Sequence, residues 1–255
     1  MAQSLDRALD LLETLATSGD DVALSQLTER TGLPLGTVHR LLRTLVARGY
    51  AAQNPETRLY GPGPGLLRVA ARAAASRRFD LTRIARPSLR ELTANTDETS
   101  NLLTLQGDEG VYSEQVASPH LVRMFTEVGQ RVPLYCTGGG KAILSGFSSE
   151  QLEAYLSRVE RRPWTTKTLV AAETLRHELA IARERGFALD DEEREVGVCC
   201  VAAPIFDRTG RCIAALSISG PTTRLSLARA VALGPRVRQA ADGCSMQLGF
   251  VLAVG

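Results

Sequence analysis

Two apolar runs near the end of the chain, joined by a short turn, constrain its fold more than any other feature. GVCCVAAPIFD spans residues 197–207, and CIAALSISG spans residues 212–220. The turn between them, DRTG at residues 207–210, carries the glycine that tight turns favour. Two strand-like runs around such a turn indicate a β-hairpin. The chain is therefore expected to build a sheet that includes this pair of strands.

The segments around the hairpin predict a mixed unit of helices and strands. Amphipathic periodicity predicts helices, and short apolar runs between turn residues predict strands. Helices are expected at residues 81–97, 141–146, 149–157, 172–185 and 227–248, and further strands at 101–107, 110–117 and 121–129. Strands with helices packed outside them give an α+β fold.

The alternation of side chains along each hairpin strand shows which of them share a face. Successive residues of a strand point to opposite faces, so Ser217 and Ser219 share one face of their strand. Val198 and Cys200 likewise share a face, and Cys199 points the other way. Each hairpin strand therefore presents one pair of these side chains on a single face, where a ligand or a packed helix can contact both members of the pair.

The first sixty residues predict a separate, smaller unit. Helices are expected at residues 4–18, 24–31 and 35–48, with Gly32 and Gly49 ending the second and third. Two extended segments, residues 50–53 and 58–61, flank the turn NPET and indicate a hairpin. Three helices and a hairpin are the layout of a winged helix–turn–helix. The alanine- and arginine-rich stretch after GPGPG suits a linker helix.

The third of these helices has an unusual exposed face. Val38, Leu41, Leu42 and Leu45 fall at i, i+3, i+4 and i+7 and form its buried stripe. The positions between them hold small, polar and basic residues, and residues 33–50 include no acid. A solvated helix face normally mixes both signs of charge, so this face suits an anionic partner.

Composition and charge limit the class of protein. No apolar run approaches the roughly 20 residues that a membrane-spanning helix needs, and the N-terminus lacks the layout of a signal peptide. Five cysteines without paired metal spacing indicate a reducing, cytoplasmic compartment. Residues 1–78 hold ten arginines and seven acids, a net charge of +3, whereas the rest of the chain has a net charge of −1. The asymmetry is consistent with a polyanion bound by the N-terminal unit.

Two blocks of the sequence resemble a known family. SLDRALDLLETLA at residues 4–16 and LTERTGLPLGTVHRLLRTLVARGY at residues 27–50 resemble the N-terminal half of IclR-type bacterial transcription regulators. The block ALDDEEREVGVCCVAAPIFDRTGRCIAALSISGP at residues 188–221 resembles the most diagnostic part of the same family. The resemblance implies a winged helix–turn–helix at residues 1–62, a linker helix at 63–78 and a GAF-like effector-binding domain at 79–255. It also implies a dimer or a dimer of dimers, and a repressor or activator of transcription whose operator binding responds to a small organic acid.

The resemblance assigns DNA contacts to the N-terminal unit. Its implied contact residues are Ser25, Leu35, Gly36, Thr37, His39, Arg40, Arg43 and Arg58. A helix–turn–helix places its recognition helix in the major groove of double-stranded DNA, so Thr37 and Arg40 are expected at base edges. His39 and Arg43 lie at the flanks and suit phosphates. Arg58 in the hairpin is expected at the backbone or the minor groove.

The stretch YCTGGGKAIL at residues 135–144 is the second chemical signal. A phosphate-binding loop needs Gly six residues before the lysine and Ser or Thr after it, but Tyr135 and Ala142 occupy these places. The three glycines are compatible with a tight turn or with free N–H groups that hold an anion at a helix N-terminus. In IclR-type regulators this place holds a small carboxylate. The resemblance therefore implies that the backbone amides of Gly138 and Gly139 bind the carboxylate.

The family pocket carries over onto a set of polar and apolar residues. The implied effector-binding residues are Leu121, Met124, Val132, Gly138, Gly139, Asp190, Val198, Cys200, Ser217 and Ser219. Asp190 is the difficult member, because an ionised carboxylate repels an anionic ligand. It must be protonated, paired or bonded to a ligand hydroxyl.

Two further classes of function are weighed against a regulator. One is an enzyme, such as a thiol-dependent hydrolase that uses Cys200 with His177 and Asp190. The other is a module that only binds a protein partner. A hydrolase is disfavoured because no nucleophile-elbow pattern surrounds Cys200 and His177 lies on a polar helix. No cofactor, metal or membrane is expected to bind.

Overall fold

The computed structural model describes residues 2–74 and 80–251 of the 255-residue chain. The chain divides into two compact units, Met1–Arg77 and Arg78–Gly255. A helix, α4, spans Pro64–Ala74 within the range expected for a linker, and residues 75–78 of that range lie outside the described residues.

The N-terminal unit is a helix–turn–helix followed by a small hairpin. Its elements are α1 (Ala2–Thr17), α2 (Leu24–Thr31), α3 (Leu35–Ala47), β1 (Ala51–Gln53), β2 (Tyr60–Pro62) and α4. β1 and β2 pair antiparallel, and Val22 forms an isolated bridge with Tyr60 on the free side of β2. The predicted stripe of α3 packs inward against Leu11 and Leu15 of α1. The winged helix–turn–helix prediction is confirmed.

Glycines allow the chain to pass close to the end of α3 after the wing. The Gly65 amide donates to the carbonyl of Gly49, at an N···O distance of 2.7 Å. A Cβ at Gly65 would lie 2.5 Å from that carbonyl oxygen, and one at Gly63 would lie 2.4 Å from it. Pro64 between them begins α4, a position where its missing N–H costs nothing.

The C-terminal unit is an antiparallel sheet between two layers of helices. Its elements are α5 (Leu81–Thr96), β3 (Thr99–Gln106), β4 (Glu109–Val116), β5 (Arg131–Pro133), α6 (Gly138–Ser145), α7 (Ser149–Arg158), α8 (Ala172–Arg185), β6 (Ala188–Asp191), β7 (Val198–Phe206), β8 (Cys212–Pro221) and α9 (Leu227–Gln247). Among the described residues the strand order is β5-β4-β3-β8-β7-β6. The α+β prediction and the late hairpin, β7 with β8, are confirmed.

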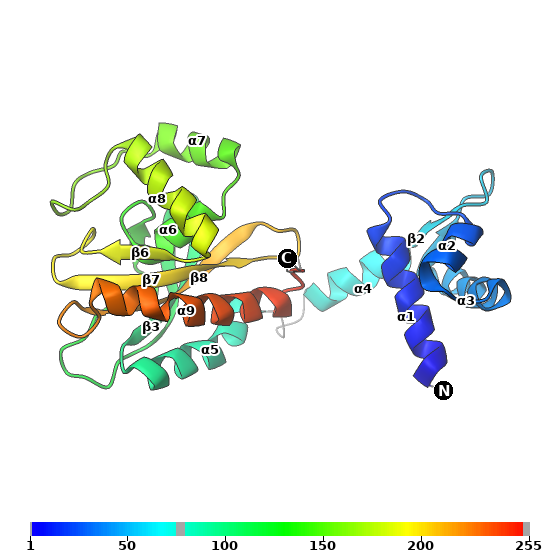
Figure 1. Ribbon diagram of the computed structural model, residues 1–255, viewed down its shortest axis with the longest axis horizontal. Helices are drawn as coiled ribbons and strands as arrows, with labels where there is room; N and C mark the ends of the chain where they lie inside the picture. Colours follow the sequence, from blue (N-terminus) through cyan, green and yellow to red (C-terminus); the bar gives the residue numbers. More distant parts are fainter. Residues whose placement is uncertain (1, 75–79, 252–255) are drawn as a thin grey trace. The chain divides into compact units, whose positions relative to one another are not determined.

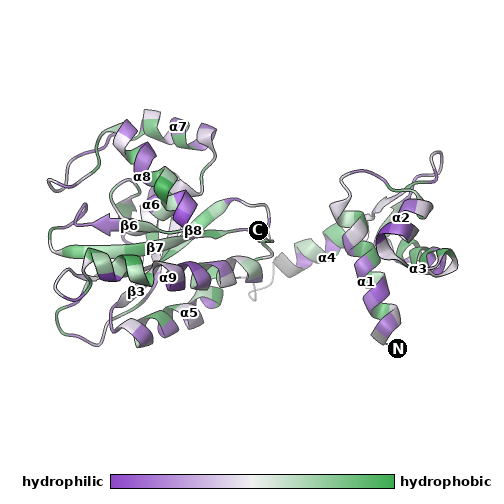
Figure 2. Ribbon diagram, in the orientation of Figure 1, coloured by the Kyte–Doolittle hydropathy of each residue, from purple (hydrophilic) through white to green (hydrophobic). Residues whose placement is uncertain are grey.

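Two hydrophobic clusters explain why the hairpin strands are apolar along both faces. One cluster joins one sheet face to α5 and α9, and the other joins the opposite face to α6, α7 and α8. Val201 and Leu216 belong to the first cluster, and their sequence neighbours Ala202 and Ala215 belong to the second. Figure 1 shows α9 and α5 along one side of the strands and α6 and α8 along the other. In Figure 2 much of the length of β7 and β8 is hydrophobic.

The predicted strand at residues 121–129 is wrong. This stretch is an irregular connection between β4 and the short strand β5. β5 pairs with β4 through residues 131–133 instead, at Val111, Gly110 and Glu109. Apolar residues of the connection therefore lie at the surface, with Leu121 96% exposed and Phe125 69% exposed. An apolar run indicates a strand only where a sheet edge receives it.

Candidate functional site

Strand register brings together polar residues that are distant in the sequence. Asp190 on β6 pairs with Cys200 on β7, and Cys200 pairs with Ser219 on β8. Directly paired residues point to the same face of an antiparallel sheet, and Ser217 shares that face by alternation. The three strands therefore present one polar row to the side that α6 covers.

The first turn of α6 closes over this row. Thr137 caps the helix, and its hydroxyl accepts a hydrogen bond from the Gly140 amide at 3.2 Å. A Cβ at Gly138 would lie 2.6 Å from Cys200 Sγ, so this residue contacts the polar row directly. A Cβ at Gly140 would instead lie 2.3 Å from the backbone of Leu134. The third glycine thus serves packing, while the first two lie beside the sheet row.

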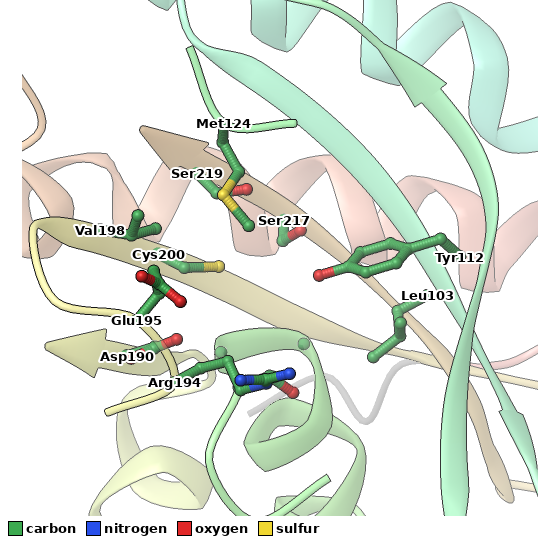
Figure 3. Close-up of a pocket in the computed structure, with 13 residues that line it drawn as sticks. Leu103, Tyr112, Met124, Asp190, Arg194, Glu195, Val198, Cys200, Ser217 and Ser219 are labelled. Atoms are coloured by element: carbon green, nitrogen blue, oxygen red, sulfur yellow. The ribbon is translucent and has the colours of Figure 1, made fainter. Parts of the chain in front are cut away.

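A narrow cavity of about 30 Å³ lies between the strands and α6 (Figure 3). A buried water occupies roughly 10–15 Å³ on this measure, so the cavity has room for about two waters. Its lining residues are Leu103, Tyr112, Met124, Thr137, Gly138, Gly139, Asp190, Arg194, Glu195, Val198, Cys200, Ser217 and Ser219. The structure therefore brings together Met124, Gly138, Gly139, Asp190, Val198, Cys200, Ser217 and Ser219 from the set that the resemblance implied.

Two residues of that set lie elsewhere. Leu121 is 96% exposed, because the connection that carries it runs over the surface. Val132 lies on β5 opposite Gly110 of β4 and is buried in the core beneath α6 and α8. Neither side chain lines the cavity. Their placement depends on the path of the connection after β4, which differs from the expected strand.

The cavity also includes residues that sequence reasoning missed. These are Leu103, Tyr112, Thr137, Arg194 and Glu195. Thr137 directly precedes the glycines, and a helix cap was foreseeable there. Leu103 and Tyr112 are paired across β3 and β4, and β3 lies beside β8. Arg194 and Glu195 lie in the turn after β6, and the sequence alone gave no sign that this turn faces the cavity.

Asp190 is buried, and its environment answers the objection to a carboxylate in an anion pocket. Burial raises its pKa to about 7, against the lowering effects of the Lys141 charge and of hydrogen bonds from backbone amides. The Glu193 amide donates to Asp190 Oδ1 at 2.8 Å. Below neutral pH Asp190 is therefore mostly protonated, and a neutral carboxyl does not repel a bound anion.

A buried ion pair fastens α6 to the turn after β6. Lys141 Nζ binds Glu193 Oε1, and their side chains are 1% and 7% exposed. Two charges at this depth are stable only as a pair, because each alone loses its hydration without compensation. The pair holds the first turn of α6 next to the β6–β7 turn, so it fixes two sides of the cavity.

Ser219 is oriented by a network that leads away from the cavity. Asn101 Nδ2 donates to Ser219 Oγ at 3.0 Å, and Thr126 Oγ1 donates to Asn101 Oδ1 at 2.9 Å. Since Ser219 Oγ accepts from Asn101, its own proton remains available to an acceptor. The same network holds Thr126 inward, and this residue lies next but one to Met124 of the cavity wall.

The hydrolase alternative does not fit this geometry. Burial raises the pKa of the Cys200 thiol well above its usual range, and the nearby Asp190 charge raises it further. A nucleophilic thiol needs the opposite shift. His177 is exposed on α8 and does not line the cavity.

The face of α3 that the sequence marked as lacking acids is open to solvent. Leu35, Gly36, His39, Arg40 and Arg43 are exposed, and Thr37 is half-buried. Of the residues from 2 to 74, none takes part in an ion pair. The arginines of this face therefore have their charges available to phosphates.

The wing presents one more basic residue. Asn54 Oδ1 accepts from the amides of Glu56 and Thr57, which closes the predicted turn. Arg58 then adopts a left-handed backbone with φ of 63° and is exposed. Ser25 is exposed at the start of α2. Both side chains are open to solvent.

The described residues show neither a metal cluster nor a membrane span. No group of three His, Cys, Asp or Glu side chains within residues 2–74 and 80–251 could hold a metal ion. None of the helices described is long and apolar enough to cross a membrane.

Each of the two units matches a known protein family. Residues 4–55 match the family described as IclR helix-turn-helix domain, and residues 73–246 match Bacterial transcriptional regulator IclR C-terminal. The chain is 39% identical to the transcriptional repressor IclR of Escherichia coli over 249 residues, which cover 97% of this chain and 90% of that protein. It is also 39% identical to the HTH-type transcriptional regulator BhcR of Paracoccus denitrificans over 239 residues, covering 94% and 85%. The crystal structure of a putative IclR transcriptional regulator from Silicibacter sp. has a TM-score of 0.83 at 28% identity and covers 98% of both chains.

Proposed function

Because this chain belongs to the IclR family of bacterial transcriptional regulators, we propose that it represses its target genes and that a small organic acid controls the repression. The helix–turn–helix binds DNA, and the C-terminal unit is the effector domain. The protein works in the cytoplasm, where its DNA and a metabolic acid are both available.

Operator recognition by α3 is supported by the unpaired basic face. Gly36 and Thr37 at the start of the helix allow close approach to base edges, and Arg40 lies about one turn further on. Arg43 and His39 flank this line and contact phosphates, and Arg58 and Ser25 add backbone contacts from the wing and α2. Leu35, exposed at the first position of α3, packs against the sugar–phosphate wall of the groove.

Dimerisation is proposed because one winged helix offers a small footprint on DNA. α4 exposes Leu67 and Val69, at 75% and 52%, and such apolar positions favour a second copy of the helix. A two-fold dimer binds a roughly palindromic operator. Sedimentation at micromolar concentration is expected to show a dimer or a tetramer, whereas a monomer that still binds the operator would contradict this.

Acid binding is carried by one observation above the others: hydrogen-bond donors converge on the cavity between the strands and α6. The first amides of α6 and the free proton of Ser219 both face it. Helix N-terminal amides favour an anion, and Ser217 lies beside Ser219 on the same strand face. The apolar wall of Met124, Val198 and Leu103 limits the ligand to a short chain.

The test is a titration of short organic acids against the preformed complex of protein and operator DNA. An acid that binds is expected to change the fraction of DNA bound, at a midpoint that Ser219→Ala raises roughly ten- to hundredfold, because a lost buried hydrogen bond costs about 1–3 kcal/mol. Without acid, Ser219→Ala should bind the operator as the wild type does.

Ser113→Ala is the matched control, since Ser113 is a β4 hydroxyl that bonds Thr104 and does not line the cavity. Its midpoint should equal that of the wild type. Equal midpoints for wild type and Ser219→Ala would place the ligand elsewhere. Ser219→Ala also removes the hydrogen bond with Asn101. Thermal unfolding of each variant therefore shows whether the substitution destabilises the fold or affects only acid binding.

A further inference from the structure

The acidic turn after β6 has nearly all of its charges matched from outside the cavity. Lys167 Nζ lies 3.0 Å from Asp191 Oδ2 and 2.8 Å from Glu192 Oε1. Glu193 binds Lys141, and Asp190 accepts backbone amides. The acids that precede Arg194 in sequence are thus already occupied.

Arg194 stands in the middle of this turn without a matching partner. Across the part of the chain that the structure describes, its guanidinium forms no ion pair, and its buried Nε has no hydrogen-bond partner. An enclosed donor without an acceptor costs free energy, so such a group in a native protein calls for a ligand or a water. Arg194 lines the cavity and is the one cationic side chain among its lining residues.

The ring of Trp164 holds the guanidinium in a fixed plane. Arg194 Cζ lies 3.6 Å from the ring centroid. The ring is itself anchored, because Trp164 Nε1 donates to Tyr135 Oη at 3.0 Å and Tyr135 Oη donates to the Arg162 carbonyl at 2.9 Å. Stacking occupies a face of the guanidinium and leaves its N–H edges for an acceptor. In Figure 3 Arg194 lies beside the start of α6, on the side of the cavity opposite Met124 and Ser219.

We propose that Arg194 determines the specificity of the pocket: it pairs with the carboxylate of the ligand and selects short carboxylate anions over neutral molecules of the same shape. This inference rests on the proposed function of the cavity as an acid-binding site. The lining also includes the acids Asp190 and Glu195, so an anion needs a cation to offset them. The planar fork of arginine matches a carboxylate in geometry as well as charge.

The experiment compares acids with their uncharged amides by calorimetry, using the full-length protein. The probes are acetate and propionate, with acetamide and propionamide as neutral counterparts. Wild type is expected to prefer acetate or propionate over its amide by at least about tenfold, as charge-assisted hydrogen bonds allow. Arg194→Met should reduce this preference to about threefold or less, and Arg194→Lys should keep part of it because charge remains without the planar fork.

Lys167→Met is the matched control. It removes a positive charge from the same region, but Lys167 pairs with Asp191 and Glu192 and does not line the cavity. Its preference for acid over amide should equal that of the wild type. Since Trp164 is the only tryptophan in the chain, its fluorescence reports the stack directly. Acid is expected to change this fluorescence in the wild type and in Lys167→Met, and the amides are expected to leave it unchanged.

The outcomes separate this proposal from the proposed function. If the wild type binds acids and Arg194→Met keeps the full preference over amides, the role of Arg194 is overturned and acid sensing stands. If acids bind the wild type without changing Trp164 fluorescence, the guanidinium does not hold the carboxylate and the proposal is also overturned. If no acid binds the wild type, acid sensing itself fails. Arg194→Lys keeps the test decisive should Arg194→Met unfold.

Discussion

Charge is treated in opposite ways in the two units. Among the described residues, all ion pairs lie in the C-terminal unit, within the range 86–242. The described residues of the N-terminal unit form none. Arg40 and Arg43 extend into solvent, whereas Lys141 and Glu193 are enclosed together. Both units bind anions in this proposal, yet only the C-terminal unit encloses a charged pair beside its proposed site.

A difference in size between the two proposed ligands accounts for this contrast. DNA is too large to enter a cavity and gains most of its affinity by releasing counterions from many phosphates, which exposed cations achieve. A small acid has few atoms and gains affinity where water is excluded and donors are fixed in advance. Variants that exchange these properties therefore test the comparison.

The largest effect is expected from breaking the buried pair. Lys141→Met leaves Glu193 buried without its cation and should lower the free energy of unfolding of the C-terminal unit by about 3–5 kcal/mol. Arg43→Ala, in exposed α3, should change the free energy of unfolding by no more than about 0.5 kcal/mol. Denaturant unfolding measures both. Similar losses would show that the two units do not differ in how charge supports the fold.

A second expected effect concerns DNA alone. Arg40→Ala should weaken binding to the operator by about 1–3 kcal/mol if Arg40 contacts a base, with less change on unrelated DNA. Calorimetric affinity for short acids should stay at the wild-type value, because Arg40 belongs to the other compact unit. Fluorescence anisotropy with specific and scrambled DNA measures the first quantity. An equal loss on both DNAs would make Arg40 a phosphate contact.

A third effect is a pH dependence confined to the acid site. Asp190 has a pKa raised from 3.8 to about 7, so it loses its proton as the pH rises through neutrality. The ionised form repels an anion, and acid affinity should fall by up to about tenfold per pH unit above 7. Asp190→Asn should show a flat profile in that range.

The same shift predicts the sign of a change in stability. Because the folded pKa lies above the unfolded one, the stabilisation from protonated Asp190 is complete below about pH 4 and is lost as the pH rises to about 7. Asp190→Asn should therefore gain stability relative to the wild type across this interval. Thermal unfolding between pH 4 and pH 8 checks it, and a constant difference would contradict the assignment to Asp190.

The smallest effect is on salt dependence. Arg43→Ala should weaken all DNA sequences alike and reduce the slope of log affinity against log salt by about 0.9, the loss of one phosphate contact. Arg40→Ala provides the comparison, since a base contact changes specificity more than slope. Identical slopes and specificities for the two variants would remove the proposed division between them.

The sequence predicted local features well and the path of irregular chain poorly. α3 and the β7–β8 hairpin follow from periodicity and turn residues, which depend on neighbours in the sequence. The grouping of Ser217 with Ser219 followed from alternation alone. Leu121 and Val132 do not line the cavity, because their positions depend on the course of the connection after β4, which the sequence did not predict.

Arg194 shows a different limit of sequence reasoning. The acids directly before Arg194 in sequence form ion pairs with Lys141 and Lys167, which lie at distant positions in the chain. No local pattern reveals that an arginine within DDEEREVG is left unmatched. Such a residue is identified by its burial and by the lack of a hydrogen-bond or ion-pair partner in the structure, and not by composition.

The small volume of the cavity also limits the concentrations to which this protein can respond. Even the most efficient ligands gain only about 1.5 kcal/mol per non-hydrogen atom, so an acid of four or five such atoms binds with about 6–7.5 kcal/mol. This corresponds to a Kd no tighter than a few micromolar. An acid of this size must accumulate to micromolar or millimolar levels before it occupies the site. With the proposed acid as its ligand, the protein is suited to report the abundance of a common metabolite rather than the arrival of a scarce signal.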